Sequence, residues 1–121
     1  MAWSFSTDRP IFQQIADIIV LKIISGEYPP GYRLNAVRDL ALEAGVNPNT
    51  MQKALAELER EGLVYSQRTA GRFVSDSKEK TDKLQEEMTM ECIKTFVVQM
   101  EKMGYAKEQI IELLKKYISE N

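Results

Sequence analysis

The sequence contains no histidine and a single cysteine, Cys92. The absence of histidine excludes Ser-His and Cys-His nucleophilic pairs and the usual zinc-bound water sites. A single cysteine excludes an internal disulfide and any metal site built from several cysteines, and we expect Cys92 to be a small buried residue on a helix. No set of side chains makes a plausible active site, so we expect neither an enzyme nor a cofactor.

The sequence also lacks a long hydrophobic run and a signal-like N-terminus. No apolar stretch approaches the roughly 20 residues needed to cross a bilayer, and no basic segment precedes a hydrophobic one. The 121 residues are 44% hydrophobic and 28% charged, a balance typical of globular domains. We therefore expect a cytoplasmic protein with no membrane partner and with one modest core plus an appendage.

An excess of positive charge is missing as well. The net charge is −2, with eight Lys/Arg and eight Asp/Glu in residues 1–75 and the remaining eight and ten in residues 76–121. Nucleic-acid-binding domains usually carry a basic face. Any such face here must come from the arrangement of a few cations rather than from their number.

Two regions differ in composition. Residues 1–75 combine helical periodicity with glycine and proline, whereas residues 76–121 have one glycine, no proline and an almost continuous helical pattern. In the first region, one helix is predicted to follow Pro10 and to end before Gly26. A second is predicted to start at an Asn35 N-cap and to stop at Gly45, after a short strand at residues 32–34.

A third helix is predicted to start at Asn47-Pro48, a capping residue followed by a proline suited to the first helical position, and to end at Glu61-Gly62. Two short helices joined by a tight glycine turn predict a helix-turn-helix. The period then changes to two, which predicts strands at residues 63–66 and 72–75 joined by a loop, that is, a wing. The expected core residues are Leu40, Val46, Met51, Leu55, Leu58 and Leu63.

Several motifs of residues 10–74 resemble, in order and at family spacing, the GntR family of bacterial regulators. They are Pro10–Ile15, Gly26-Glu27, Pro30–Leu34, Val37–Ala41, Gly45–Thr50, Ala54–Glu59, Glu61–Leu63 and Gly71–Val74. The Asn-Pro-Asn-Thr start of the third helix and the tail of only about 45 residues resemble the short YtrA-type members in particular. The resemblance implies an α+β, mainly α fold, with a winged helix-turn-helix in residues 1–75 and a two-helix dimerisation domain in residues 76–121.

The sequence departs from the family pattern at three places. The family commonly has Pro-Ser where Asn35-Ala36 stands, and Thr69 replaces the first glycine of the wing's Gly-x-Gly. Many longer members have arginine where Pro48 and Gln52 stand, so their base readout is not carried over to this chain.

The resemblance implies a sequence-specific transcriptional regulator, with repression the favoured outcome, that binds double-stranded DNA. The N-terminal side chains of a recognition helix face base edges in the major groove, and here these are Asn47, Asn49, Thr50, Gln52 and Lys53. Asparagine and glutamine can pair with adenine, and the threonine methyl group can contact thymine. Amide groups at the starts of the second and third helices are natural phosphate donors.

Further contacts are implied by family position. Arg38 matches the family arginine that reaches DNA, and Arg68, Gly71 and Arg72 belong to the wing. Four cations, Arg38, Lys53, Arg68 and Arg72, would then face DNA, while the acidic residues Glu57, Glu59 and Glu61 lie at the far end of the third helix.

Each of these residues has an alternative role. Asn47 can act only as a helix cap, and Thr50 and Gln52 can be ordinary surface residues. Arg38 can form a surface ion pair with Asp39 or Glu43, which contributes little to stability. Arg33 and Arg60 are interpreted as structural or solvated.

The tail predicts a homodimer. Apolar residues recur at three- and four-residue steps on one long helix and, after Gly104, on a second one. Two such helices cannot bury these faces against each other alone, so a twin subunit is the expected cover, with packing onto the first helix as the alternative. The residues expected at the interface are Leu84, Met88, Cys92, Phe96, Met100, Ile110, Leu114 and Tyr117.

A small-molecule effector, if one exists, is expected at the dimer interface, because the tail leaves little room for a pocket within one subunit. Two other function classes compete with a dimeric regulator. A winged helix that acts only as a protein-interaction module is disfavoured by the polar start of the third helix and by the wing arginines, and an enzyme is disfavoured by the lack of a plausible site.

Overall fold

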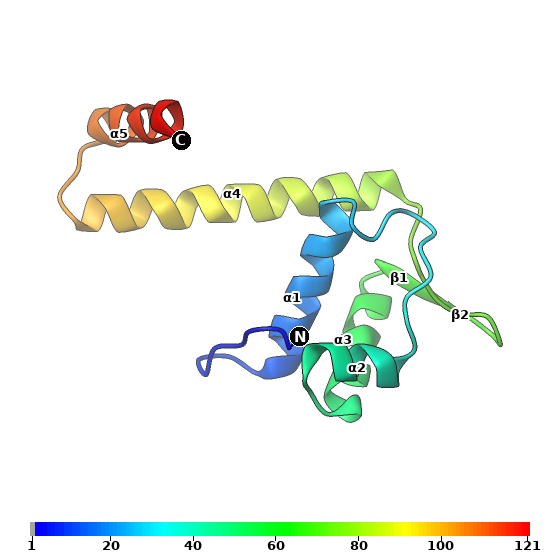
Figure 1. Cartoon of the computed structure of the whole chain (residues 1–121). Coiled ribbons are helices and arrows are strands. Elements are labelled where there is room, and N and C mark those ends of the chain that lie inside the picture. Colours follow the sequence, from blue (N-terminus) through cyan, green and yellow to red (C-terminus); the bar gives the residue numbers. More distant parts are fainter. Residues whose placement is uncertain (1) are drawn as a thin grey trace. The chain divides into compact units, whose positions relative to one another are not determined.

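The computed structural model describes residues 2–121 (Figure 1). Its elements in chain order are helices α1 (Ile11–Ile24), α2 (Val37–Ala44) and α3 (Pro48–Arg60), strands β1 (Val64–Gln67) and β2 (Gly71–Val74), and helices α4 (Lys78–Lys102) and α5 (Lys107–Glu120). This order confirms the predicted α+β, mainly α fold. The chain forms two compact units, residues 1–82 and 83–121, so the first unit extends through the first turn of α4.

The first unit has a core built from α1, α2, α3 and the inner side of the hairpin. α3 packs against both other helices, and the apolar side chains between them are fully buried. They include Ile15, Ile19, Leu40, Met51, Leu55, Leu58, Val64 and Val74. Burying each such side chain stabilises the fold by roughly 1.5–3 kcal/mol. All the predicted core residues are buried except Val46, which is half-buried.

The helix boundaries were predicted correctly at α1 and α3 but not at the start of α2. Asn47 caps α3, where its side-chain oxygen accepts a hydrogen bond from the Asn49 amide at 2.7 Å. Asn35 does not cap α2, because the cap residue is Ala36. The Leu34 amide donates to the Arg72 carbonyl at 2.9 Å, so the chain before Asn35 is still extended along β2 and the helix begins one residue later.

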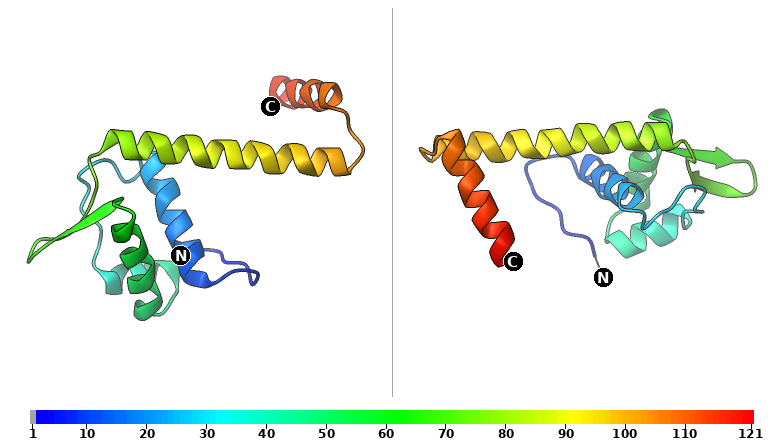
Figure 2. Two further views of the ribbon diagram at one scale, coloured as in Figure 1. Left: turned by 180° about the vertical axis from the view of Figure 1, so that it is seen from behind. Right: turned by 90° about the horizontal axis from the view of Figure 1, so that it is seen from above.

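The wing is an antiparallel hairpin in which Val64 pairs with Val74 and Gln67 with Gly71. Both strands lie one residue closer to the tip of the hairpin than predicted: residues 63–66 and 72–75 were expected, and residues 64–67 and 71–74 are observed. Residues 31–34 add hydrogen bonds along the outer edge of β2, but they form an isolated bridge at Arg33 and Phe73 rather than the predicted short strand. The hairpin projects beyond the three helices (Figure 2).

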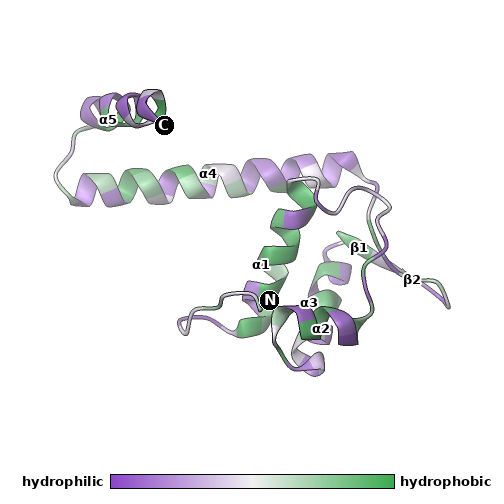
Figure 3. Ribbon diagram, in the orientation of Figure 1, coloured by the Kyte–Doolittle hydropathy of each residue, from purple (hydrophilic) through white to green (hydrophobic). Residues whose placement is uncertain are grey.

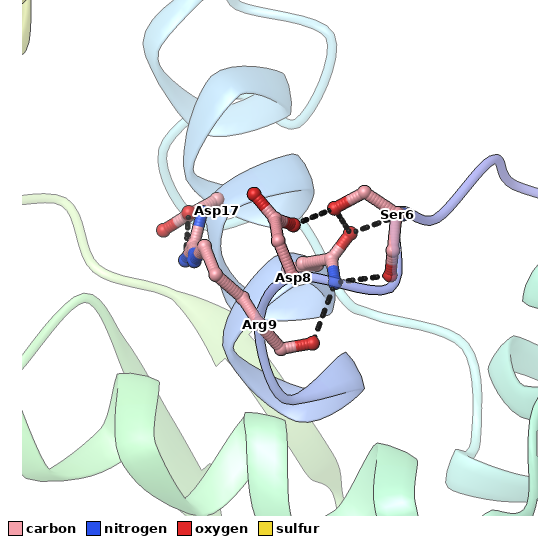
Figure 4. A network of polar contacts seen from close by, with 5 residues as sticks. Ser6, Asp8, Arg9 and Asp17 are labelled. Carbon is pink, nitrogen blue, oxygen red and sulfur yellow. Dashed lines mark hydrogen bonds and ion pairs between the residues drawn. The ribbon is translucent and has the colours of Figure 1, made fainter.

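The segment before α1 is held to that helix by polar contacts (Figure 4). The Gln14 side-chain oxygen accepts from the Ser6 amide at 2.8 Å, and its amino group donates to the Ser6 and Arg9 carbonyls at 3.0 and 2.9 Å. Arg9 forms an ion pair with Asp17 at 2.7 Å. These contacts attach residues 6–9 to the first two turns of α1.

α4 and α5 expose most of their apolar side chains. Green apolar segments alternate with purple polar ones along both helices (Figure 3). α4 has no buried residue, and on α5 only Ile110 is buried. The prediction that Cys92 is buried is wrong for the single chain, because its side of α4 is uncovered and the thiol is exposed. Within residues 2–121, no helix has the length and apolar character needed to cross a membrane.

Candidate nucleic-acid interface

The start of α3 presents the polar side chains that were predicted to reach bases. Asn47, Asn49 and Gln52 are exposed, and Thr50 is half-buried. The oxygen of Asn47 is used by the cap, so its side-chain amino group is the part left for an external partner. This end of the helix therefore offers amide and hydroxyl groups of neutral charge.

Two contacts define what lies on either side of α3. On one side, the Lys53 ammonium lies over the Phe12 ring of α1, 4.1 Å from the ring centre. On the other side, Glu59 bonds to Arg72 of the wing. Gln52 is two helical turns before Glu59 and so shares its face. The exposed strip of α3 is thus bordered by α1 and by the wing.

A hollow of about 430 Å³ lies between the start of α2 and the wing. Its two walls come from segments far apart in sequence, which the pairing of residues 31–34 with β2 brings together. Arg33, Asn35, Ala36 and Val37 line one wall, and Ser66, Gln67, Thr69, Gly71 and Arg72 line the other. Two arginines in one open, partly polar hollow make it suited to an anionic group such as a phosphate.

The start of α2, which lines this hollow, has no side-chain cap. Ala36 has no side-chain acceptor, and α2 has no side-chain cap hydrogen bond. The first amide groups of the helix are therefore free to bond to an external anion, which the helix dipole also favours. Arg38 in this first turn is exposed, and none of the ion pairs among residues 2–121 includes it.

The wing residues differ from one another in environment. Arg68, at the tip, is exposed, whereas Arg72 is half-buried and pairs with Glu59. A β-carbon on Gly71 would lie 3.3 Å from the Arg33 guanidinium, so Arg33 packs closely on the wing backbone. The sequence analysis did not assign Arg33 to this surface. The available signal was its position in a segment that was expected to be extended.

Glu59 was expected to lie far from the interface, and the structure shows that it contacts the wing. The Arg72 guanidinium beside it, followed by the hydroxyl of Ser66, holds the pKa of Glu59 below its ordinary value against the opposing effect of partial burial. Glu57, by contrast, pairs with Arg60 within α3. Sequence periodicity could not distinguish these two glutamates because both are polar residues at the end of the same helix.

A helix-turn-helix followed by a hairpin wing, with an exposed polar recognition helix and a cation-lined hollow beside it, defines a winged-helix DNA-binding protein. Residues 11–74 match the family described as bacterial regulatory proteins, gntR family. The chain therefore belongs to the GntR family, and it is a DNA-binding transcriptional regulator.

Two relatives from Bacillus subtilis match almost the whole chain. The uncharacterized HTH-type transcriptional regulator YhcF is 38% identical over 113 residues, which are 93% of each chain. The HTH-type transcriptional repressor YtrA is 35% identical over 112 residues, which are 91% of this chain and 85% of YtrA. This full-length similarity places the chain among the short YtrA-type members, as its motifs predicted.

Solved structures show the same fold. A GntR family regulator from Listeria monocytogenes has a TM-score of 0.85 and 36% identity, with 93% of this chain and 98% of that chain covered. The DNA-binding domain of AraR in complex with operator ORX1 has a TM-score of 0.57 and 25% identity and covers 62% of this chain and 95% of that one. The alternative of a protein-interaction module finds no support among these proteins.

Proposed function

We propose that the protein is a repressor that binds a palindromic operator as a homodimer in the bacterial cytoplasm. The observation that carries this proposal is the exposed polar start of α3 beside the hollow between α2 and the wing. One surface then combines neutral hydrogen-bonding groups suited to base edges with cations and free amides suited to phosphates.

In this arrangement the start of α3 enters the major groove. Asn49 and Gln52 have exposed carboxamides that can pair with adenine, and the Thr50 methyl group can contact thymine. Asn47 contributes its free amino group. Lys53, held toward α1 by Phe12, is better placed for the DNA backbone than for a base.

The phosphate backbone is bound by the groups around the hollow. Arg33 and Arg72 line it, together with the uncapped start of α2. Arg38 and Arg68 are exposed on either side of it, and Gly71 allows the wing backbone to approach closely. These few clustered cations provide a basic face in a chain whose net charge is −2.

Dimerisation is assigned to α4 and α5. Their exposed apolar side chains include Ile93 and Phe96 on α4, Met103 just after α4, and Ile111, Leu114 and Tyr117 on α5. A monomer with so few cations would bind DNA at about the non-specific level of 10⁻⁴–10⁻⁶ M, and a dimer engages two half-sites. Leu84, Met88, Cys92 and Met100 complete the proposed interface, and any small-molecule effector is placed there as well. Ile110, which was predicted to belong to the interface, is already buried within the single chain, with 5% exposure.

Selection of bound fragments from random duplex DNA, followed by titration at several salt concentrations, tests the proposal. Arg38→Ala should weaken binding to all sequences and reduce the salt slope by about one unit. Gln52→Ala should instead change the selected sequence. Arg9→Ala serves as the control, because Arg9 is a cation of the same unit that pairs with Asp17 of α1 and lies away from the exposed strip of α3. It should leave the salt slope unchanged. A chain that binds no duplex at low ionic strength would contradict the proposal.

A further inference from the structure

A single carboxylate oxygen of Glu59 bonds to both strands of the wing. Glu59 Oε1 accepts a hydrogen bond from the Ser66 hydroxyl at 2.7 Å and another from Nε of Arg72. Ser66 is on β1 and Arg72 is on β2, and the two residues are directly paired across the hairpin. One acceptor on α3 therefore fixes a cross-strand pair of the wing.

This network lies between the two parts of the DNA-binding surface. Its side chains are partly shielded, with Arg72 21% and Glu59 30% exposed. Glu59 shares a face of α3 with Gln52, which is proposed to read a base, and Arg72 lines the hollow proposed to hold a phosphate. The network thus connects the base-reading helix to the phosphate-binding hollow.

The guanidinium of Arg72 is only partly used by this contact. Among the described residues, its side-chain hydrogen bonds involve Nε alone. The two terminal nitrogens remain available, and a guanidinium held at one edge is well suited to bind a phosphate with the other, because its planar donors are rigidly arranged.

We infer that Glu59 is a positioning residue for DNA binding, which holds Arg72 with its free edge toward a phosphate in the hollow and keeps the wing in place against α3. The inference rests on the proposed function. It assigns to an acidic residue a favourable role at a surface that binds a polyanion.

The direction in which DNA affinity changes when Glu59 is removed distinguishes a positioning role from simple charge repulsion. A carboxylate near DNA repels phosphates, so removal of Glu59 should strengthen binding if its charge alone matters. If Glu59 positions Arg72, its removal should weaken binding. The bonds from Arg72 and Ser66 keep Glu59 ionised at neutral pH, so both effects are present under ordinary assay conditions.

The test is equilibrium binding of the full chain to a duplex that the wild-type protein selects from a random-sequence library, at several salt concentrations. Glu59→Ala should bind about tenfold more weakly, with a salt slope reduced by about 0.9, as in Arg72→Ala. The double variant should bind no more weakly than Arg72→Ala. Glu59→Gln, which retains an acceptor oxygen, should recover most of the lost affinity.

Glu57→Ala is the matched control, because it removes the same charge from the same helix without touching the wing, and it should not weaken binding. Thermal unfolding checks that each variant is folded. If Glu59→Ala does not fold, Arg72→Lys decides, since lysine keeps the charge but cannot bond to Glu59 and a phosphate through two edges. It should bind as weakly as Arg72→Ala.

The inference is overturned if Glu59→Ala binds as tightly as Glu57→Ala with an unchanged salt slope, or if Arg72→Lys binds like wild type. Wild-type protein that binds no duplex at low ionic strength overturns the proposed function itself. The two failures are therefore distinguishable.

Discussion

The β-carbon of Ala2 lies 2.9 Å from the position that a β-carbon on Gly45 would occupy. Gly45 ends α2 with a φ of 76°, in the left-handed region, and starts the turn to α3. Trp3, which follows Ala2, donates its amide hydrogen to the Ala44 carbonyl at 3.1 Å. The N-terminal segment is therefore packed directly against the turn of the helix-turn-helix.

Gly45→Ala should destabilise the protein more than Gly26→Ala does. Both glycines have positive φ, but a β-carbon on Gly26 would meet nothing within 4 Å, so Gly26→Ala measures backbone strain alone, about 1–2 kcal/mol. Gly45→Ala adds the clash with Ala2. It should also change the fluorescence of Trp3, the only tryptophan. Equal losses in urea unfolding and unchanged fluorescence would show that the segment is not held there.

Thr69→Asn in the wing should raise stability. Thr69 is the one described non-glycine residue with positive φ, 68°, and it stands where the family commonly has glycine. A β-branched residue in this conformation is strained, whereas asparagine tolerates it, so a gain of about 0.5–1 kcal/mol is expected. Thr69→Val keeps the β-branch and should show no gain. A higher unfolding temperature for the valine variant would argue against strain at this position.

Phe12 and Lys53 should show energetic coupling. A cation–π contact with a solvent-exposed cation contributes roughly 0.5–1 kcal/mol, and the exposed Lys53 ammonium lies 4.1 Å from the centre of the half-buried Phe12 ring. Chemical unfolding of Phe12→Leu, Lys53→Met and the double variant measures the coupling, because the cycle cancels the separate packing losses. A coupling of zero would mean that the ring does not hold the ammonium.

Leu114→Glu should convert the proposed dimer to a monomer. Leu114 is 43% exposed on the apolar side of α5, and a charge buried there on association would be unpaired. Loss of the second half-site should weaken operator binding on the order of a hundredfold. Lys116→Glu changes the charge on the polar side and should remain dimeric in sedimentation. A dimeric Leu114→Glu would remove α5 from the proposed interface.

Alkaline pH should destabilise the fold through Tyr28. Burial, followed by the negative charge of Glu43, raises the pKa of Tyr28 from 10.0 to about 12. The folded state therefore retains the phenol proton after the unfolded state has released it. This contribution to stability is complete below pH 10 and is lost as the pH rises toward 12, by up to about 1.4 kcal/mol per pH unit.

Urea unfolding between pH 9 and 12 measures this effect. Tyr28→Phe should remove the tyrosine-dependent part of the slope. Tyr105→Phe should keep it, because Tyr105 is 39% exposed and lies outside the proposed dimer interface. A slope that is unchanged in Tyr28→Phe would assign the alkaline loss to another group.

Local features of the chain were sufficient to predict most of the first unit. The Asn47-Pro48 start of α3, the glycine after α2 and the alternation in the hairpin act through hydrogen bonds and backbone angles within a few residues. Such effects need no knowledge of distant segments. The order of the helices and strands and the presence of a helix-turn-helix could accordingly be predicted from the sequence.

Contacts between distant segments were decided only by the tertiary structure. The pairing of residues 31–34 with β2 moved the start of α2 from Asn35 and placed Arg33 in the hollow. The bond between Glu59 and Arg72 depends on the angle at which the hairpin meets α3. A polar residue at a helix end has the same local pattern whether it faces solvent or a partner, so its role is set by what the fold brings within hydrogen-bonding distance.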